Sequence, residues 1–238
     1  FPRPRPGQQE LIAATGAALG HGARLFVQAP TGIGKTISVL YPAVRALGAG
    51  QLDKVFYLTP KTVLRTVAER AADDLRAVGL RLRSLTLTAR GRVCFQGQQR
   101  PWCDPAACPF ALGYYDRIDG ALEQALQQTA LDRQTVEGLA REHCVCPFEL
   151  SLELSLWVDL VICDYNYVFD PRAYLRRFFA DGGGRYALLV DEAHDLVDRA
   201  REMFSAELRS GPARTLQRQL GPAHRPLGRQ LGQIERQL

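Results

Sequence analysis

Residues 29–36 read APTGIGKT, and this spacing of glycine, lysine and threonine suits the binding of a chain of phosphates. Gly32 and Gly34 lack side chains, so backbone N–H groups can close around phosphate oxygens there. Lys35 would reach the β- and γ-phosphates, and the Thr36 hydroxyl would ligate Mg²⁺. The first position of the loop is alanine, where glycine is usual. The stretch predicts a nucleotide-phosphate site.

A phosphate site of this kind needs a carboxylate partner, and residues 186–196, YALLVDEAHDL, supply one after an apolar run. Asp191 would hold Mg²⁺, directly or through water, and Glu192 would position and deprotonate an attacking water. His194 either links the nucleotide site to a neighbouring domain or is an ordinary surface residue. Together with the loop, these acids predict nucleotide hydrolysis.

Cysteine supplies the third kind of chemistry, because five of the six cysteines fall between residues 94 and 146. Cys103 and Cys108 could form a disulfide, hold a metal, act as a redox pair or be buried thiols. No secretory signal is present, so metal or redox use is favoured over disulfides. Four thiolates could hold an iron–sulfur cluster or a structural zinc. Cys163 lies in an apolar run and is predicted to be a core residue.

These residues need a scaffold in which strands and helices alternate, and the apolar pattern predicts one. An apolar strand at 25–28 should lead into the loop, and a helix should follow from about Gly34. Alternation of this kind indicates a parallel α/β sheet. The pattern breaks near Ala89, and residues up to about 149 read as an insertion of loops and helices. The remaining expected strands are 54–60, 157–165 and 186–190, and the remaining expected helices are 8–20, 62–79, 119–131, 135–143 and 170–180.

Composition sets wide limits. The 238 residues are 46% hydrophobic and 23% charged, enough for one large domain with insertions. The net charge of +5 permits an anionic partner without establishing one. No apolar run reaches the length of a membrane span, so we expect no membrane partner. The chain begins with Phe1, and we expect a segment of a longer protein.

The order of these motifs resembles that of a known family. APTGIGKT and VDEAH are similar to motifs I and II of superfamily 2 helicases, and the cysteine-bearing insertion between them is typical of the XPD/DinG-type iron–sulfur DNA helicases. Residues 146–171, CPFELSLELSLWVDLVICDYNYVFDP, resemble the family's stretch from the last cluster cysteine to an Asp-Pro turn. Residues 5–8, RPGQ, resemble its adenine-side motif.

The resemblance implies an ATP-dependent helicase or translocase that moves 5′ to 3′ on single-stranded or forked DNA, in DNA repair. Its cofactors would be ATP, Mg²⁺ and a [4Fe-4S] cluster. It implies a RecA-like motor domain (1–89 and 150–204), an inserted Fe–S domain (90–149) and the start of a helical arch insertion (205–238). A second motor domain should follow in the full-length chain, which we expect to be a monomer, cytoplasmic, nucleoid-associated and bacterial. The alternatives are a non-catalytic nucleic-acid-binding or scaffold module, and a DNA translocase that does not unwind.

The resemblance also assigns binding residues. Arg5 and Gln8 would lie near the adenine. The loop would bind nucleotide through Thr31, Gly32, Ile33, Gly34, Lys35 and Thr36, with Asp191. Thr59, Lys61 and Thr62 would contact the DNA backbone, although a simple helix cap remains the alternative for this stretch. Leu64 and Arg65 stand where the family usually has a glutamine.

For the metal, the family pattern maps onto Cys94, Cys103, Cys108 and Cys146, with Cys144 as the alternative to Cys146. Basic and aromatic residues in the insertion suit single-strand binding by phosphate attraction and base stacking, and Arg90 and Arg92 are the predicted contacts. The other reading is that these arginines are solvated beside an anionic cluster. Tyr165 is also a predicted DNA contact, although it could instead pack the sheet edge.

Overall fold

The computed structural model describes residues 5–30, 32–60, 62–97, 103–180 and 182–207, followed by 211, 215–216, 219–220 and 224–237. The chain divides into two compact units, Phe1–Val197 and Asp198–Leu238. The first contains a sheet with its covering helices. The second contains most of α10 (Leu196–Phe204) and all of α12 (Arg225–Gln237). The domain limits expected from the sequence remain predictions.

The first unit is built on a five-stranded parallel sheet with strand order β3-β2-β4-β1-β5. This arrangement confirms the predicted α/β class and the parallel pairing. The carboxyl ends of all the strands therefore lie at one edge of the sheet, where α/β proteins bind their ligands. The strands are β1 (Lys54–Leu58), β2 (Ser84–Thr86), β3 (Ala130–Leu131), β4 (Leu160–Cys163) and β5 (Tyr186–Val190).

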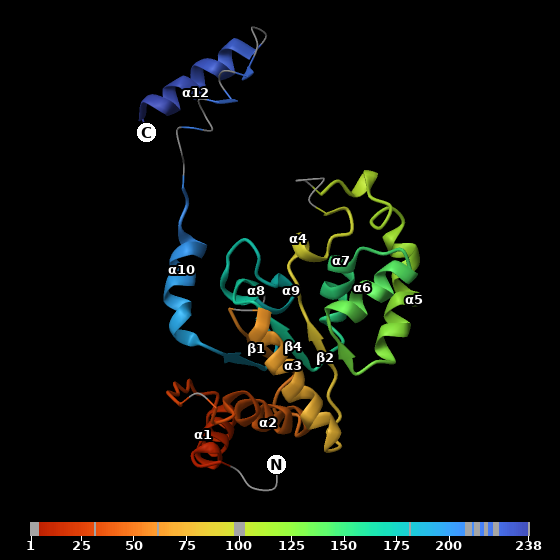
Figure 1. The fold of residues 1–238 in the computed structure, drawn as a ribbon, viewed down its shortest axis with the longest axis vertical. Coiled ribbons are helices and arrows are strands. Elements are labelled where there is room, and N and C mark those ends of the chain that lie inside the picture. The colour runs from red at the N-terminus through yellow and green to blue at the C-terminus, as the bar shows by residue number, and fades with distance from the viewer. Residues whose placement is uncertain are drawn as a thin grey trace. The chain divides into compact units, whose positions relative to one another are not determined.

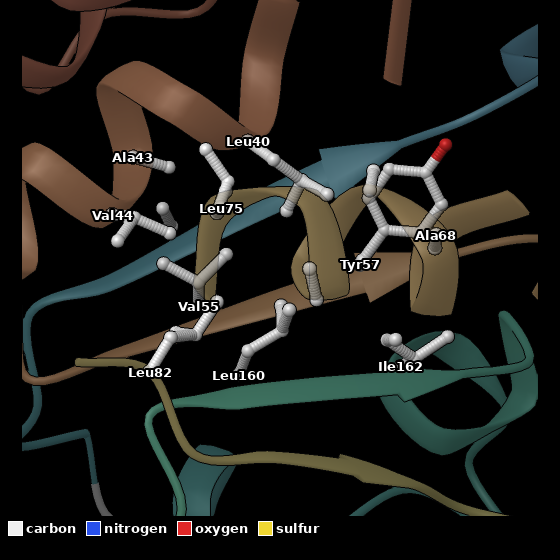
Figure 2. Close-up of a cluster of buried hydrophobic side chains, with 13 residues drawn as sticks. Leu40, Ala43, Val44, Val55, Tyr57, Ala68, Leu75, Leu82, Leu160 and Ile162 are labelled. Carbon is white, nitrogen blue, oxygen red and sulfur yellow. The ribbon is translucent and has the colours of Figure 1, made fainter. Parts of the chain in front are cut away.

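Side chains alternate along β1, so successive residues point to opposite faces of the sheet and pack against the helices there. Val55 and Tyr57 point into a core formed with helices α2 (Lys35–Gly48) and α3 (Thr62–Ala77), which Figure 2 shows in close-up. Phe56 points the other way and packs against the rings of α9 (Arg176–Phe179). The spacing of apolar residues predicted both covering helices of the first face correctly.

The insertion between β2 and β4 forms a small helical group beside the sheet (Figure 1). Helices α5 (Tyr114–Leu126), α6 (Arg133–Glu142) and α7 (Pro147–Leu154) pack against one another. The short helix α4 (Arg90–Val93) packs on α7. Both predicted helices of this region are present with shifted ends. The sequence pattern predicted neither β2 nor β3, because both are too short to show a clear alternation.

Two predicted elements differ in the structure. The strand at 25–28 does not form. Residues 23–30 are irregular, and Phe26 is 90% exposed. A strand needs a neighbour to bond its backbone, and residues 25–28 pair with none of the described strands. The helix predicted at 170–180 is reduced to α9, because the Asp170 carboxylate accepts the Arg172 N–H and forms a turn after α8 (Asn166–Phe169).

Candidate functional site

The candidate site lies where the ends of β1, β4 and β5 meet the amino end of α2. Helix α1 (Gln8–Gly20) packs against α2 and brings the N-terminal segment to the same place. The backbone of the loop turns through two glycines in the left-handed region, Gly32 with φ 81° and Gly34 with φ 88°. At this φ any side chain on Gly34 would be strained, and it would also displace the Gln8 amide, so glycine is favoured there.

The loop has the free donors that a phosphate needs. Among the described residues, no side chain caps the amino end of α2, so its first N–H groups point outward from Gly34. The space beside Gly32 is open for 4 Å around the position of a Cβ atom. Lys35 Nζ donates to the Ala29 carbonyl at 3.2 Å and thus lies over the loop. These features fit a bound polyphosphate. Thr31 lies outside the described residues.

The predicted adenine-side residues lie directly against the loop. The Arg5 N–H donates to Gln8 Oε1 at 2.6 Å, and the Arg5 guanidinium donates to the Gly32 carbonyl. The short N-terminal motif is therefore in contact with the phosphate loop. Its role in nucleotide binding stays a prediction.

Tyr57, which the sequence reasoning missed, joins the two predicted Mg²⁺ ligands. Its hydroxyl lies 3.3 Å from Thr36 Oγ1 and also hydrogen-bonds the Asp191 carboxylate. Burial raises the pKa of Asp191, while the Tyr57 hydrogen bond and the nearby Lys35 charge lower it. Both candidate ligands are hard oxygen donors held within reach of one hydroxyl, which fits Mg²⁺. Only the long-range pairing of β1 with β5 could have revealed Tyr57.

Glu192 follows Asp191 at the end of β5 in an unusual backbone conformation. Its φ of 50° places a non-glycine residue in the left-handed region, which costs free energy and often marks functional sites. Its N–H donates to Asp191 Oδ1 at 3.1 Å. His194 lies 3.4 Å from the Glu192 carboxylate and 3.3 Å from Asp195. The predicted acids therefore stand together beside the phosphate loop.

The predicted DNA-contacting residues differ in their exposure to solvent. Arg90 and Arg92 are exposed on the insertion. Thr59 is fully buried, and its hydroxyl has no hydrogen-bond partner among the described residues, so its side chain offers DNA no surface. Lys61 and the side chain of Thr62 lie outside the described residues.

Tyr165 is also fully buried, which corrects its assignment as a direct DNA contact. Its single hydroxyl proton is shared instead between the backbone carbonyls of Asp191 and Glu192. The ring therefore lies inside the protein, where no nucleic acid can reach it.

The cysteines of the insertion are partly brought together. All six thiols lie in described residues and form no disulfide. Cys94 ends α4 and Cys146 begins α7, so the packing of these helices brings them close. Burial raises the pKa of the Cys146 thiol, and the N–H groups of Phe148 and Glu149 oppose that effect. Cys163 is buried in β4, as predicted.

A complete metal site is not assembled. In the part of the chain that the structure describes, no group of three His, Cys, Asp or Glu side chains is close enough to hold a metal. The donor chemistry suits an iron–sulfur cluster. Of the four predicted ligands, Cys94 and Cys146 lie near enough for their charges to interact.

Arg117, which the sequence reasoning also missed, ties the two cysteine-bearing segments together. Its guanidinium donates to the carbonyls of Pro109 and Leu112 at 3.1 and 2.7 Å, and to that of Cys144 at 2.8 Å. The Cys144 Sγ in turn lies 3.8 Å from the Pro109 carbonyl, beside Cys108. The loop after Cys108 and the segment before Cys146 are thus held side by side.

A basic cavity of about 470 Å³ opens next to Cys94. Arg92, Arg133 and Arg141 line it together with Phe95 and Phe110. The Arg141 guanidinium lies over the Phe95 ring, 4.3 Å from its centroid. Glu137 forms an ion pair with Arg133 at 2.6 Å and so neutralises part of the positive charge.

No helix within the described residues is long and apolar enough to cross a membrane.

The parallel sheet, the phosphate loop and the acidic strand end define a P-loop α/β motor domain. The family model DEAD_2 matches residues 64–211. The chain therefore belongs to the DEAD_2 family, and its resemblance to XPD/DinG-type superfamily 2 helicases is confirmed.

Individual relatives agree with this membership. The chain is 23% identical over 225 residues to "Regulator of telomere elongation helicase 1 homolog" of Caenorhabditis elegans, covering 77% of this chain and 22% of that protein. It is 33% identical over 76 residues to "Fanconi anemia group J protein homolog" of Gallus gallus, covering 32% and 6%. The chain thus spans about a fifth of the nematode relative. These relatives are animal proteins and lend no support to a bacterial origin.

Solved structures share the fold. "XPD_Helicase" superimposes with a TM-score of 0.68 at 18% identity, covering 98% of this chain and 41% of that one. "Truncated XPD" gives 0.66 at 19% identity, covering 96% and 65%. At this identity the likeness speaks for the fold alone.

Proposed function

We propose that this chain is the nucleotide-binding motor portion of an ATP-dependent DNA helicase. One observation carries the proposal. Thr36 at the start of α2 and Asp191 at the end of β5, far apart in sequence, meet at the Tyr57 hydroxyl beside Lys35. Phosphate-binding donors and magnesium-binding oxygens thereby converge, which is the arrangement that phosphoryl transfer from a nucleotide needs.

Each residue has a distinct role in this proposal. Lys35 and the N–H groups of the loop bind the β- and γ-phosphates. Thr36 and Asp191 would hold Mg²⁺, which neutralises phosphate charge when it is bound. Glu192 orients the attacking water and takes its proton. Arg5 and Gln8 orient the base against the loop.

The decisive experiment compares Lys35→Ala and Glu192→Gln with wild type in the full-length protein. Both variants should lower DNA-stimulated ATP hydrolysis by about 10²-fold or more, because general-base catalysis alone contributes about that much. Glu123→Gln, an exposed change on α5, is the matched control and should hydrolyse ATP at the wild-type rate. Equal turnover in all four proteins would instead favour a non-catalytic nucleic-acid-binding module.

Direction and unwinding belong to the same proposal. The family resemblance supports movement 5′ to 3′ on single-stranded DNA. A strand-displacement assay with 5′- and 3′-tailed duplexes should release the labelled strand only from the 5′-tailed substrate. ATP hydrolysis without release from either substrate would identify a translocase that does not unwind.

We further propose that the insertion holds a [4Fe-4S] cluster through Cys94, Cys103, Cys108 and Cys146. The closeness of Cys94 to Cys146 and the Arg117 bonds beside Cys108 and Cys144 support it. Protein purified without oxygen should contain about four irons per chain. Cys146→Ser should lose that iron and Cys144→Ser should retain it. The reverse result would make Cys144 the fourth ligand, and iron-free wild type would exclude the cluster.

The resemblance also supports a second motor domain in the same full-length protein, which we propose acts as a monomer on DNA. Such a domain commonly supplies an arginine to the transition state, worth about 10³–10⁵ in rate in related systems. Residues 1–238 alone should therefore hydrolyse ATP slowly. Rapid DNA-stimulated turnover by the isolated segment would contradict this expectation.

A further inference from the structure

The buried hydroxyl of Tyr165 connects two strand ends of the candidate site. Tyr165 lies just after β4, while Asp191 and Glu192 lie just after β5, and β1 separates these strands in the sheet. The Tyr165 hydroxyl donates to the Asp191 carbonyl and lies 3.0 Å from the Glu192 carbonyl. The Tyr165 side chain therefore reaches across the end of β1 and contacts the backbone of both acids.

These contacts hold Glu192, the proposed general base, whose orientation toward the attacking water matters most for hydrolysis. The peptide groups around Glu192 are held on every side. Its N–H donates to Asp191 Oδ1, and its carbonyl accepts from Tyr165 and from the Asp195 N–H at 2.9 Å. With φ at 50°, Glu192 would relax to an ordinary conformation if these bonds were lost. Its carboxylate would then point elsewhere.

Burial protects the contacts that the Tyr165 hydroxyl makes. The side chain is fully buried, so water does not compete for the two carbonyls.

The residue next to Tyr165 is tied to a neighbouring helix. Asp164 pairs with Arg65 at 3.6 Å, and both side chains are largely buried. Arg65 belongs to α3 and also donates to the Leu87 carbonyl after β2 at 3.3 Å. The backbone that carries Tyr165 is therefore connected to α3 and to the end of β2.

We propose that Tyr165 is a positioning residue that holds Glu192 for catalysis, and that the Arg65–Asp164 pair holds the Tyr165 backbone in turn. The inference rests on the proposed function of the site. It adds a role for a residue that touches neither nucleotide nor DNA.

Tyr165→Phe tests the first half, because it removes only the hydroxyl and keeps the ring. In the full-length protein, DNA-stimulated kcat should fall about tenfold, as is common when a supporting hydrogen bond is lost. The KM for ATP and the DNA affinity should change less than twofold. Tyr167→Phe is the matched control. That residue is also buried and lies two positions along, and it should retain the wild-type kcat.

Hydrogen exchange supplies a readout independent of activity. In Tyr165→Phe, amides in a peptide covering 191–196 should exchange about tenfold faster, and the rest of the sheet should not change. A loss of fold would speed exchange everywhere. Unchanged exchange at 191–196 would overturn the positioning role.

The second half is tested by Arg65→Met, alone and with Tyr165→Phe. If both act through one connection, the double variant should lose no more DNA-stimulated rate than the stronger single variant. Multiplying losses would overturn the role of the Arg65–Asp164 pair. Glu192→Gln separates the failures. If it abolishes turnover while Tyr165→Phe does not reduce it, only this inference fails. If Glu192→Gln leaves turnover intact, the proposed function fails and takes the inference with it.

Discussion

The Tyr57 hydroxyl would support the predicted Mg²⁺ site without binding the metal itself. It contacts both Thr36 and Asp191, so it fixes the spacing of two oxygens that would share Mg²⁺. Supporting groups of this kind commonly change metal affinity by about 10- to 100-fold.

We therefore predict that Tyr57→Phe raises the Mg²⁺ concentration needed for tight ATP binding by about tenfold. Titration of a fluorescent ATP analogue at varied Mg²⁺ measures this without turnover. Tyr186→Phe, also in the sheet, is the control and should titrate as wild type. An unchanged Mg²⁺ requirement in Tyr57→Phe would show that its hydroxyl does not support the site.

Lys54 is the least expected residue of the sheet. It is 5% exposed, its Nζ donates to the carbonyls of Leu156 and Val158, and it lies 5.6 Å from the Phe178 ring. Burial lowers the pKa of Lys54 to about 8, against a weaker opposing effect of Asp159. A charged lysine here is therefore a cost to the folded state at neutral pH.

The pH dependence follows from that lowered pKa. Between about pH 8 and the ordinary value of 10.5, the unfolded chain binds more protons than the folded one, so stability should rise with pH. The gain should approach about 3 kcal/mol. Urea unfolding of wild type and Lys54→Met across this range measures it. Only the wild type should gain, and a constant difference between the two proteins would contradict the shift.

Among the elements, α6 depends on a clear local signal. Asp132 precedes the helix and accepts the Thr135 N–H at 2.8 Å, which satisfies one of the donors that every helix start leaves open. Helix α6 carries Arg133 and Arg141 of the basic cavity, so its stability bears on the whole insertion.

Asp132→Ala should therefore destabilise the protein by about 1 kcal/mol, the usual value of an N-cap. Asp132→Asn keeps a capping oxygen and should remain within a few tenths of a kcal/mol of wild type. Denaturant midpoints of the three proteins test this. Equal losses in both variants would assign the effect to charge instead of capping.

At the scale of the whole molecule, the charge distribution bears on DNA binding. The net charge is +5, and exposed arginines border the basic cavity of the insertion. If these arginines contact phosphates, bound counterions are released and affinity falls as salt rises.

Arg90→Gln combined with Arg92→Gln should then weaken binding to oligothymidine and flatten the slope of log affinity against log salt by about 1.4, at about 0.7 per single-strand contact. Fluorescence anisotropy over a salt series measures the slope. Arg81→Gln, between α3 and β2 at the opposite edge of the sheet, should leave it unchanged. An equal slope in wild type and double variant would remove the insertion from the DNA path.

The sequence by itself determined the chemistry of the site and much of its scaffold. Gly32, Gly34, Lys35 and Thr36 are predicted to act through backbone freedom and side-chain type within one short loop, so their pattern is readable without a fold. The same is true of the Asp191–Glu192 pair, and of α3, whose apolar spacing reports the face that it buries. The clustering of the cysteines likewise predicted thiolate ligands from the sequence alone.

Only the tertiary structure decided which distant residues serve that chemistry. Tyr57 and Tyr165 reach the acidic strand end across neighbouring strands, and no local pattern encodes which strands are neighbours. Tyr165 was predicted to contact DNA, but it is buried, and its hydroxyl contacts the backbone after β5 instead. Residues 25–28 have the composition of a strand but pair with none of the described strands, which the local pattern could not reveal. Periodicity reports a residue's own surroundings, whereas pairing and burial depend on the whole chain.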